Sequence, residues 1–215
     1  MTWIERSVIL PVILLAWPVA SGDTNVTCVY QKSCVLPCTF PPAGEELIHW
    51  ILLEKEEIFV HSYYNTQDQL QYQNQRYRQR TSVFHDQIPG GNASLRLTTV
   101  TLQDEGRYRC YTSTVKGNME VFIHLEVEVP LGEVDVDLVN NTVTCSSKGI
   151  YPKPKLKWST QPPSKLTYQI PILKNHQELY DISSSLDVRN NSQFTYICSV
   201  SNNRGTRKTF FHQPV

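Results

Sequence analysis

Residues 102–111 read LQDEGRYRCY and set four residues two positions apart: Asp104, Gly106, Tyr108 and Cys110. In an extended strand, side chains two positions apart lie on the same face of the sheet. The alternate positions, which include Arg109 and Tyr111, therefore face the other way. This stretch predicts a strand with one buried face and one polar, aromatic face.

The spacing Asp-x-Gly-x-Tyr-x-Cys resembles the turn and strand F of an immunoglobulin variable-type domain. The resemblance implies that the Tyr108 hydroxyl hydrogen-bonds back to the turn and that Cys110 bridges two sheets. It also implies an ion pair between Asp104 and Arg80, which stands where variable-type domains place an arginine. The alternatives are a turn into an unrelated strand with a buried cysteine, and a solvated Arg80.

The length and charge of the chain bound its class. A chain of 215 residues suits two domains of about 100 residues each. Twenty Lys and Arg balance twenty Asp and Glu, so the formal net charge is zero. This balance gives no general attraction for nucleic acid or for an anionic membrane, and it argues against a basic-patch binder.

The N-terminus carries an apolar run, SVILPVILLAWPVA at residues 7–20, which is short for a bilayer span. Arg6 precedes it and small residues up to Gly22 follow, which is typical of a signal peptide over residues 1–22. The alternative is an N-terminal membrane anchor. No other stretch approaches 18 apolar residues, so we expect a secreted or cell-surface location, with any membrane attachment through a C-terminal anchor not present in this chain.

Six cysteines in a chain of the secretory pathway favour three disulfides. One Cys…Trp…Cys order occurs twice, with the members Cys38, Trp50 and Cys110, then Cys145, Trp158 and Cys198. Because immunoglobulin domains share this order, it predicts two domains with one inter-sheet bridge each. The remaining pair is Cys28 and Cys34, although Cys34 and Cys38 lie four residues apart and an exchange of their roles stays open.

The fold class that follows is all-β, with two tandem immunoglobulin-like sandwiches: a variable-type domain at residues 23–129 and a constant-type domain at 130–215. In the first, RTSVF (80–84) is expected to pair with ASLRLTTV (93–100) across the turn IPGGN, where two glycines supply positive φ. In the second, GIYPKPKLKW (149–158) resembles the constant-type signature Gly-x-Tyr-Pro-x-Pro-x-x-x-Trp.

Two features of the surface need an interpretation. A basic cluster in the second domain, made of Lys148, Lys153, Lys155 and Lys157, is interpreted as a solvated face, with an acidic partner or a glycan as the alternative. Four Asn-x-Ser/Thr sequons are candidate glycosylation sites near strand ends or turns: Asn25, Asn92, Asn140 and Asn190.

Strand phase predicts an exposed face on the first domain. If Trp50 and Cys110 point inward, alternation sends their neighbours outward, and the adjoining strands add more outward positions when Phe59 points in. The alternative is that this face is covered by neighbouring strands or by the second domain. The predicted outward set has the composition of an interaction hot spot and consists of His49, Ile51, Ile58, Val60, Arg109, Tyr111, Phe122 and His124.

The segments VHSYY (60–64), RYRQR (76–80), GNASL (91–95) and LQDEGRYRCY resemble the butyrophilin-related ligands that tune T-cell activation, the B-seven (B7) family. Within that family the chain is similar to the programmed-death ligands and to the HERV-H LTR-associating ligand. The resemblance implies an extracellular ligand whose first-domain front sheet binds a lymphocyte receptor. The alternatives are a homophilic cell–cell adhesion protein and a soluble decoy.

The sequence lacks the motifs of an enzyme. Six histidines are scattered without metal spacing, and neither a Gly-x-Ser-x-Gly elbow nor a phosphate loop occurs. The alternative of a zinc site at Cys28, Cys34 and Cys38 lacks the spacing of a zinc knuckle. We therefore expect no catalysis, cofactor, metal, small-molecule substrate or nucleic-acid partner.

Overall fold

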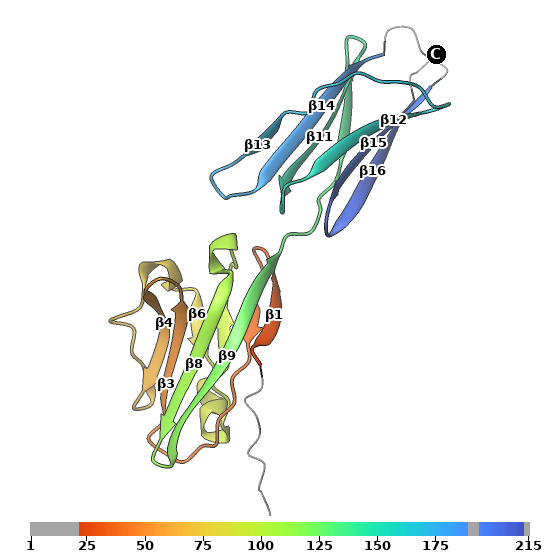
Figure 1. Ribbon diagram of the computed structural model, residues 1–215. Helices are drawn as coiled ribbons and strands as arrows, with labels where there is room; N and C mark the ends of the chain where they lie inside the picture. The colour runs from red at the N-terminus through yellow and green to blue at the C-terminus, as the bar shows by residue number, and fades with distance from the viewer. Residues whose placement is uncertain (1–21, 189–193, 213–215) are drawn as a thin grey trace, which may run out of the picture.

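The computed structural model describes residues 22–188 and 194–212. The chain forms two all-β units joined end to end (Figure 1). The predicted signal peptide falls almost entirely on residues outside the described part and stays a prediction.

The first unit is a sandwich of two sheets. The larger sheet has the order β1-β9-β8-β3-β4-β5, and the smaller has the order β2-β7-β6. The bounds are β1 Thr24–Val29, β2 Cys34–Leu36, β3 Leu47–Leu53, β4 Glu57–Tyr64, β5 Gln67–Asp68, β6 Thr81–Val83, β7 Leu95–Leu97, β8 Gly106–Thr114 and β9 Gly117–Glu128. Three short 3-10 helices connect them, namely η1 Gln75–Tyr77, η2 His85–Gly90 and η3 Leu102–Asp104.

The second unit is also a sandwich of two sheets. Its sheets have the orders β10-β11-β14-β13 and β12-β15-β16. This division into four and three strands is that of a constant-type immunoglobulin domain. The bounds are β10 Asp135–Val139, β11 Thr142–Ile150, β12 Lys155–Gln161, β13 Ile172–Lys174, β14 Tyr180–Asp187, β15 Thr195–Asn202 and β16 Gly205–His212.

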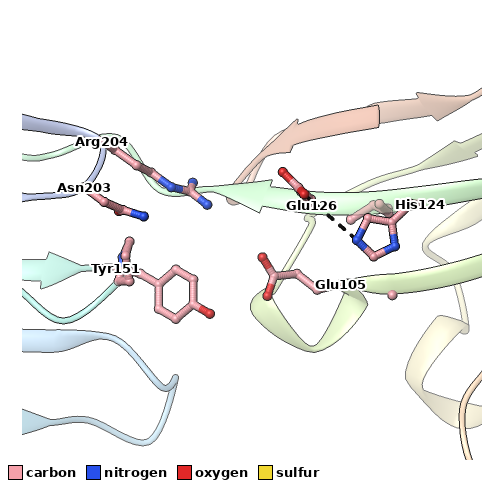
Figure 2. A pocket seen from close by; sticks show the side chains of 9 residues that line it. Glu105, His124, Glu126, Tyr151, Asn203 and Arg204 are labelled. Atoms are coloured by element: carbon pink, nitrogen blue, oxygen red, sulfur yellow. Dashed lines mark ion pairs between the residues drawn. The ribbon is translucent and has the colours of Figure 1, made fainter. Parts of the chain in front are cut away.

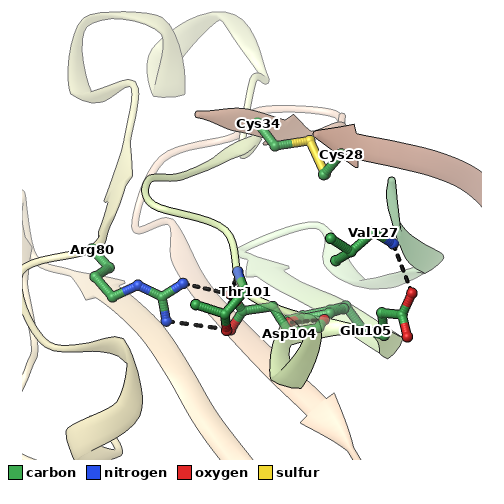
Figure 3. Close-up of a disulfide and its surroundings, with 8 residues drawn as sticks. Cys28, Cys34, Arg80, Thr101, Asp104, Glu105 and Val127 are labelled. Atoms are coloured by element: carbon green, nitrogen blue, oxygen red, sulfur yellow. Dashed lines mark hydrogen bonds and ion pairs between the residues drawn. A yellow bond between two sulfur atoms is a disulfide. The ribbon is translucent and has the colours of Figure 1, made fainter. Parts of the chain in front are cut away.

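The opening stretch LQDEGRYRCY forms η3 and the first half of β8. The Tyr108 hydroxyl donates to the Asp104 carbonyl at 2.8 Å, which is the bond back to the turn that the sequence predicts. Arg80 Nη2 lies 2.5 Å from Asp104 Oδ2, so the expected ion pair forms (Figure 3). Asp104 has no exposed surface, and its second role is to cap η3 by accepting from the Thr101 amide at 2.8 Å. This buried network fixes the turn that starts β8.

The structure contains the three expected disulfides. Cys38–Cys110 and Cys145–Cys198 cross the two sandwiches, each beside a buried tryptophan, and Cys28–Cys34 joins β1 to β2. In Figure 3 the Cys28–Cys34 bridge lies above the turn that holds Asp104. Cys28 is buried and belongs to the first hydrophobic core, so the short bridge also packs β1 onto the sandwich.

The connection between β6 and β7 differs from the expected tight hairpin. Thr81 pairs with Leu97 and Val83 with Leu95, so the two strands are antiparallel neighbours as predicted. The chain between them forms η2, and only Gly91 has a positive φ, of 89°, while Gly90 ends the 3-10 helix. A Cβ at Gly91 would lie 2.3 Å from the Phe40 carbonyl oxygen, so close packing as well as φ requires glycine there.

Candidate functional site

The candidate site is the outer face of the six-stranded sheet in the first unit. The pairing of β3 with β8 sets Trp50 opposite Cys110, both fully buried, and His49 opposite Tyr111. The pairing of β8 with β9 sets Arg109 opposite Phe122. Six of the eight predicted contact residues therefore share the outward phase: His49, Ile51, Arg109, Tyr111, Phe122 and His124.

Two of the predicted contact residues, Ile58 and Val60, take the opposite phase. Val60 is fully buried in the first core and Ile58 packs against that core, while Phe59 between them is 37% exposed. The cause is a β-bulge: Trp50 pairs with His61, but the next residue of β3, Ile51, pairs with Phe59. One extra residue in β4 reverses every side chain beyond it, so the expected outward positions of Ile58 and Val60 are wrong and Phe59 belongs to the face.

Ile51 takes the outward phase but is only 5% exposed. Its cross-strand neighbours are Arg109 on one side and Phe59 on the other. The expectation that Ile51 is exposed is therefore wrong, because large side chains on both neighbouring strands cover it. Ile51 therefore packs between the side chains of this face and does not contribute exposed surface to it.

An aromatic cluster occupies the centre of the face. The His49 and Tyr111 rings stack at 6.2 Å with planes 17° apart, and Phe59 meets His49 edge-on at 6.2 Å. Ser62 Oγ lies 2.9 Å from His49 Nδ1 and holds the imidazole in place. Burial lowers the pKa of His49 below its usual value of 6.5, so the ring is neutral at pH 7. We define the three rings of His49, Phe59 and Tyr111, together with Ser62 that supports His49, as the aromatic cluster.

Arg109 lies beside the aromatic cluster and is held between two carboxylates. Its Nη2 is 2.8 Å from Glu57 Oε1, and its Nε is 3.7 Å from Glu120 Oε1. The arginine side chain is 24% exposed, whereas both glutamates are about half exposed, at 53% and 42%. Such a fixed arginine loses little side-chain freedom when a partner binds.

Arg107 on β8 lies at the edge of the outer face that is nearest to β1. Its guanidinium lies 4.1 Å above the Phe122 ring and donates through Nε to Asp23 Oδ2 at 2.6 Å. This hydrogen bond lowers the pKa of Asp23. Phe122 is thus partly covered by a cation that is itself exposed, which gives this edge a polar rim.

His124, the eighth predicted residue, lies at the junction of the two units. It lines a cleft of about 500 Å³ together with residues of both units. Figure 2 shows Glu105, His124 and Glu126 on one side and Tyr151, Asn203 and Arg204 on the other. His124 Nε2 is 4.0 Å from Glu126 Oε1. The phase of β9 is therefore as expected, but His124 lies away from the aromatic cluster, two pairing steps beyond Phe122.

Sequence reasoning missed five residues of this face: Glu57, Phe59, Ser62, Arg107 and Glu120. Arg107 and Glu120 follow from the phase already assigned to β8 and β9 and were detectable. Phe59 and Glu57 required knowledge of the bulge, for which the segment EIFVHSYY carries no glycine or other signal.

The predicted glycosylation sites lie in different settings. Asn25 on β1 and Asn140 in the turn after β10 are exposed, whereas Asn92 is half-buried. The Asn92 side chain donates to Gln87 Oε1 at 2.6 Å and accepts from the Ser94 amide at 2.9 Å. Asn190 lies outside the described residues. Occupancy of all four sites stays a prediction.

In the ranges 22–188 and 194–212 no three His, Cys, Asp or Glu side chains gather in a way that would hold a metal ion. In the same ranges no helix has the length and apolar character needed to traverse a bilayer. The outer face offers aromatic rings, hydrogen-bonding groups and two arginines held by carboxylates, Arg107 and Arg109, which suits recognition of another surface.

Comparison with known proteins follows the same division of the chain. The immunoglobulin V-set domain matches residues 21–128, and the butyrophilin subfamily 3 member A2-like Ig-C domain matches residues 133–209. The chain is 33% identical over 181 residues to human HERV-H LTR-associating protein 2, covering 80% of this chain and 41% of that protein. It is 32% identical over 177 residues to human V-set domain-containing T-cell activation inhibitor 1, covering 72% of this chain and 62% of that protein. The chain thus spans less than two thirds of either relative.

Solved structures share the arrangement of both units. A chain in the crystal structure of ICOS in complex with ICOS-L and an anti ICOS-L VNAR domain superposes with a TM-score of 0.69 at 21% identity, covering 88% of this chain and 99% of that chain. Bovine butyrophilin superposes with a TM-score of 0.66 at 21% identity, covering 91% and 97%. At this identity the likeness concerns the fold. Fold, family matches and sequence identity agree, and the chain belongs to the B7/butyrophilin-like family of the immunoglobulin superfamily, with a V-set domain followed by a butyrophilin-like Ig-C domain.

Proposed function

We propose that this chain is an extracellular ligand that binds a lymphocyte receptor through the outer face of its six-stranded sheet and thereby modulates T-cell activation. The observation that carries the proposal is the aromatic cluster beside Arg109, on a sheet face over which the described chain places no further layer. Aromatic rings and arginine dominate the binding energy of protein interfaces.

Family membership supports the extracellular setting. Members of the B7/butyrophilin-like family are extracellular or cell-surface immune ligands and not enzymes in general. One relative is named a T-cell activation inhibitor, which favours inhibition as the sign of the effect here. We expect the receptor to offer an acidic group to Arg109 and an apolar contact to Tyr111 and Phe59.

The geometry favours binding without rearrangement. His49 is held by Ser62, and Arg109 is held by Glu57, so both side chains already occupy defined positions. Partners that are organised before association lose less conformational entropy on binding. The aromatic cluster has a charged rim formed by Glu57, Glu120 and Arg107, and for an interface of standard size or smaller we expect modest affinity.

The test is a pair of tyrosine substitutions in the first unit. Tyr111→Ala removes the ring that stacks on His49, while Tyr72→Ala removes a ring that is 75% exposed in the loop after β5, outside the paired strands of the face. We expect Tyr111→Ala to weaken binding to T cells by about tenfold or more, because a central aromatic residue contributes on the order of 2 kcal/mol.

Tyr72→Ala is expected to bind like the native chain, and both variants should keep the native melting temperature. Equal loss of binding in both folded variants would show that the outer face is not the binding site. Loss of folding in Tyr111→Ala would show that Tyr111 is a structural residue and would contradict its assignment to the exposed face.

A further inference from the structure

The outer face of the second unit's three-stranded sheet carries lysines and no acidic residue. Residues 23–129 carry 9 Lys and Arg against 13 Asp and Glu, a formal charge of −4, while residues 130–215 carry 10 against 6, a charge of +4. The zero net charge of the chain therefore conceals two oppositely charged halves. The second unit is therefore basic although the whole chain has no net charge.

Within the second unit the charges separate again. All six acidic residues belong to the side of the four-stranded sheet or lead into it, and they are Glu133, Asp135, Asp137, Glu178, Asp181 and Asp187. The strands β12, β15 and β16 contain no Asp or Glu, and neither does any residue from 138 to 177. The predicted lysine cluster is divided by the fold, because Lys148 lies on β11 whereas Lys155 and Lys157 lie on β12.

Strand register places Lys155, Lys157 and Lys208 close together on the outer face of the three-stranded sheet. Trp158 and Cys198 are a buried pair, so Lys157, Ser199 and Lys208 form one row across the outer face. The next row on one side consists of Lys155, Ser201 and Thr206, and the next on the other side consists of Ser159, Ile197 and Phe210. Successive rows are about 7 Å apart along the strands, and neighbouring strands are about 5 Å apart.

These lysines have no acidic partner in the described part of the chain. None of its ion pairs involves Lys155, Lys157 or Lys208, and each of the three is exposed. Phe210 is 60% exposed at the end of the array. The described sequons lie elsewhere, on β1, before β7 and after β10, so no glycan at those positions would originate on this face.

We propose that this face, defined by Lys155, Lys157, Ser199, Lys208 and Phe210, binds a linear sulfated polysaccharide. Ammonium groups repeated along a strand match a chain of repeated sulfates, the hydroxyls of the serines and threonines can donate to sugar oxygens, and the Phe210 ring offers a flat apolar surface for a sugar ring. A protein partner suits this face less well, since lysine and serine are depleted in protein–protein interfaces. The site is separate from the receptor-binding face and does not depend on the proposed function.

The test measures binding of the full chain to heparin oligosaccharides at several salt concentrations. We expect binding that falls steeply as NaCl rises from about 0.1 M to about 0.5 M, because salt screens exposed charges. Lys157→Ala with Lys208→Ala should weaken binding by about tenfold, while the matched pair Lys148→Ala with Lys174→Ala, on the four-stranded sheet, should change it by less than about twofold.

Three outcomes would overturn the proposal. These are no binding by the native chain at about 0.1 M NaCl, equal loss in both double variants, and stronger binding to phosphatidylserine vesicles than to heparin, which would make a membrane the occupant. Tyr111→Ala should bind heparin normally, so a failure of either the polysaccharide site or the receptor site is recognised separately. Melting temperatures of all variants should match the native chain, because every substituted lysine is exposed.

Discussion

Phe59 and Val60 are consecutive residues of β4 with opposite environments. Val60 is fully buried in the first core, whereas Phe59 is 37% exposed and touches His49 on the outer face. Hydrophobicity does not distinguish them, because the larger and more apolar side chain is the exposed one. The distinction comes from the bulge opposite Trp50 and Ile51, which fixes the phase of the strand.

This difference predicts opposite effects for two alanine substitutions. Val60→Ala should lower the free energy of unfolding by about 2 kcal/mol through a buried cavity, with little effect on receptor binding by the folded protein. Phe59→Ala should weaken binding and change stability by less than about 1 kcal/mol. Denaturant unfolding and cell binding of the two variants provide the measurement. The reverse pattern would indicate that β4 has no bulge and that Val60, not Phe59, faces outward.

His61 is a buried titratable residue of the same strand, on its inward-facing side opposite Trp50. Its Nδ1 lies 3.0 Å from Thr81 Oγ1, and its Nε2 lies 3.2 Å from Asp68 Oδ1, which also receives His85 Nε2 at 2.8 Å. Burial lowers the pKa of His61 below its usual 6.5, against the opposing effect of Asp68. The imidazole is therefore buried in its neutral form.

The lowered pKa predicts a loss of stability on acidification. Below pH 6.5 the unfolded chain protonates this histidine before the folded chain does, so the unfolded state binds more protons. The contribution of His61 to the free energy of unfolding should fall as the pH decreases from 6.5 toward the pKa of His61 in the folded chain. Below that folded-state pKa the contribution should no longer change with pH. His61→Gln should flatten the fall in denaturant titrations between about pH 7.5 and pH 5. The exposed control His176→Gln should retain it, and identical slopes in both variants would refute this role of His61.

At the scale of elements, β1 depends on its short disulfide. The strand pairs in parallel with β9 at the edge of the six-stranded sheet, and Cys28 ties it to Cys34 at the start of β2. The closed loop spans only 6 residues, against 72 for Cys38–Cys110 and 53 for Cys145–Cys198. The short bridge therefore holds one edge strand, and the long bridges hold whole sandwiches.

Replacing Cys28 and Cys34 by alanine should cost about 2 kcal/mol, compared with about 4 kcal/mol for the Cys145–Cys198 pair, because the entropy released in the unfolded chain grows with loop length. Hydrogen exchange should show faster exchange in residues 24–29 of the Cys28→Ala, Cys34→Ala variant, while β14 and β15 stay protected. An unchanged β1 together with a destabilised second unit would contradict this assignment.

The elements differ in how far the sequence predicts them. Disulfides, the Tyr108 bond and the Arg80–Asp104 ion pair were predictable because each needs particular residue types at fixed spacings. The phase of β8 followed from Cys110, and the phase of β9 followed from the inward positions of Ile123 and Leu125. The phase of β4 did not, since a one-residue bulge arises from pairing with β3 and leaves no mark on local alternation. Burial of Ile51 likewise depends on side chains from two other strands.

At the scale of the whole molecule, the two units make direct contacts. Leu179 of the second unit is 4% exposed and packs into the first core, and Arg204 Nη1 donates to the Val127 carbonyl at 2.9 Å. Figure 2 shows Arg204 and Tyr151 facing Glu105 and Glu126 across the cleft. These junction residues belong neither to the aromatic cluster of the first unit nor to the lysine-bearing face of the second.

We propose that the outer face of the six-stranded sheet, and no other face of the first unit, binds T cells. Arg109 lies on that face beside the aromatic cluster, and Arg96 lies on β7 in the opposite sheet, where its guanidinium is 4.9 Å from the Phe84 ring centre. The two residues form a matched pair, because each is an arginine on a strand of the same unit.

The most direct measurement is quantitative binding of the native chain, Arg109→Ala and Arg96→Ala to lymphocytes, together with T-cell proliferation. We predict saturable binding by the native chain, a loss of about tenfold or more for Arg109→Ala with a parallel loss of its effect on proliferation, and native behaviour for Arg96→Ala. Binding that depends on Arg96 and not on Arg109, or no saturable binding to any lymphocyte population, would contradict the account.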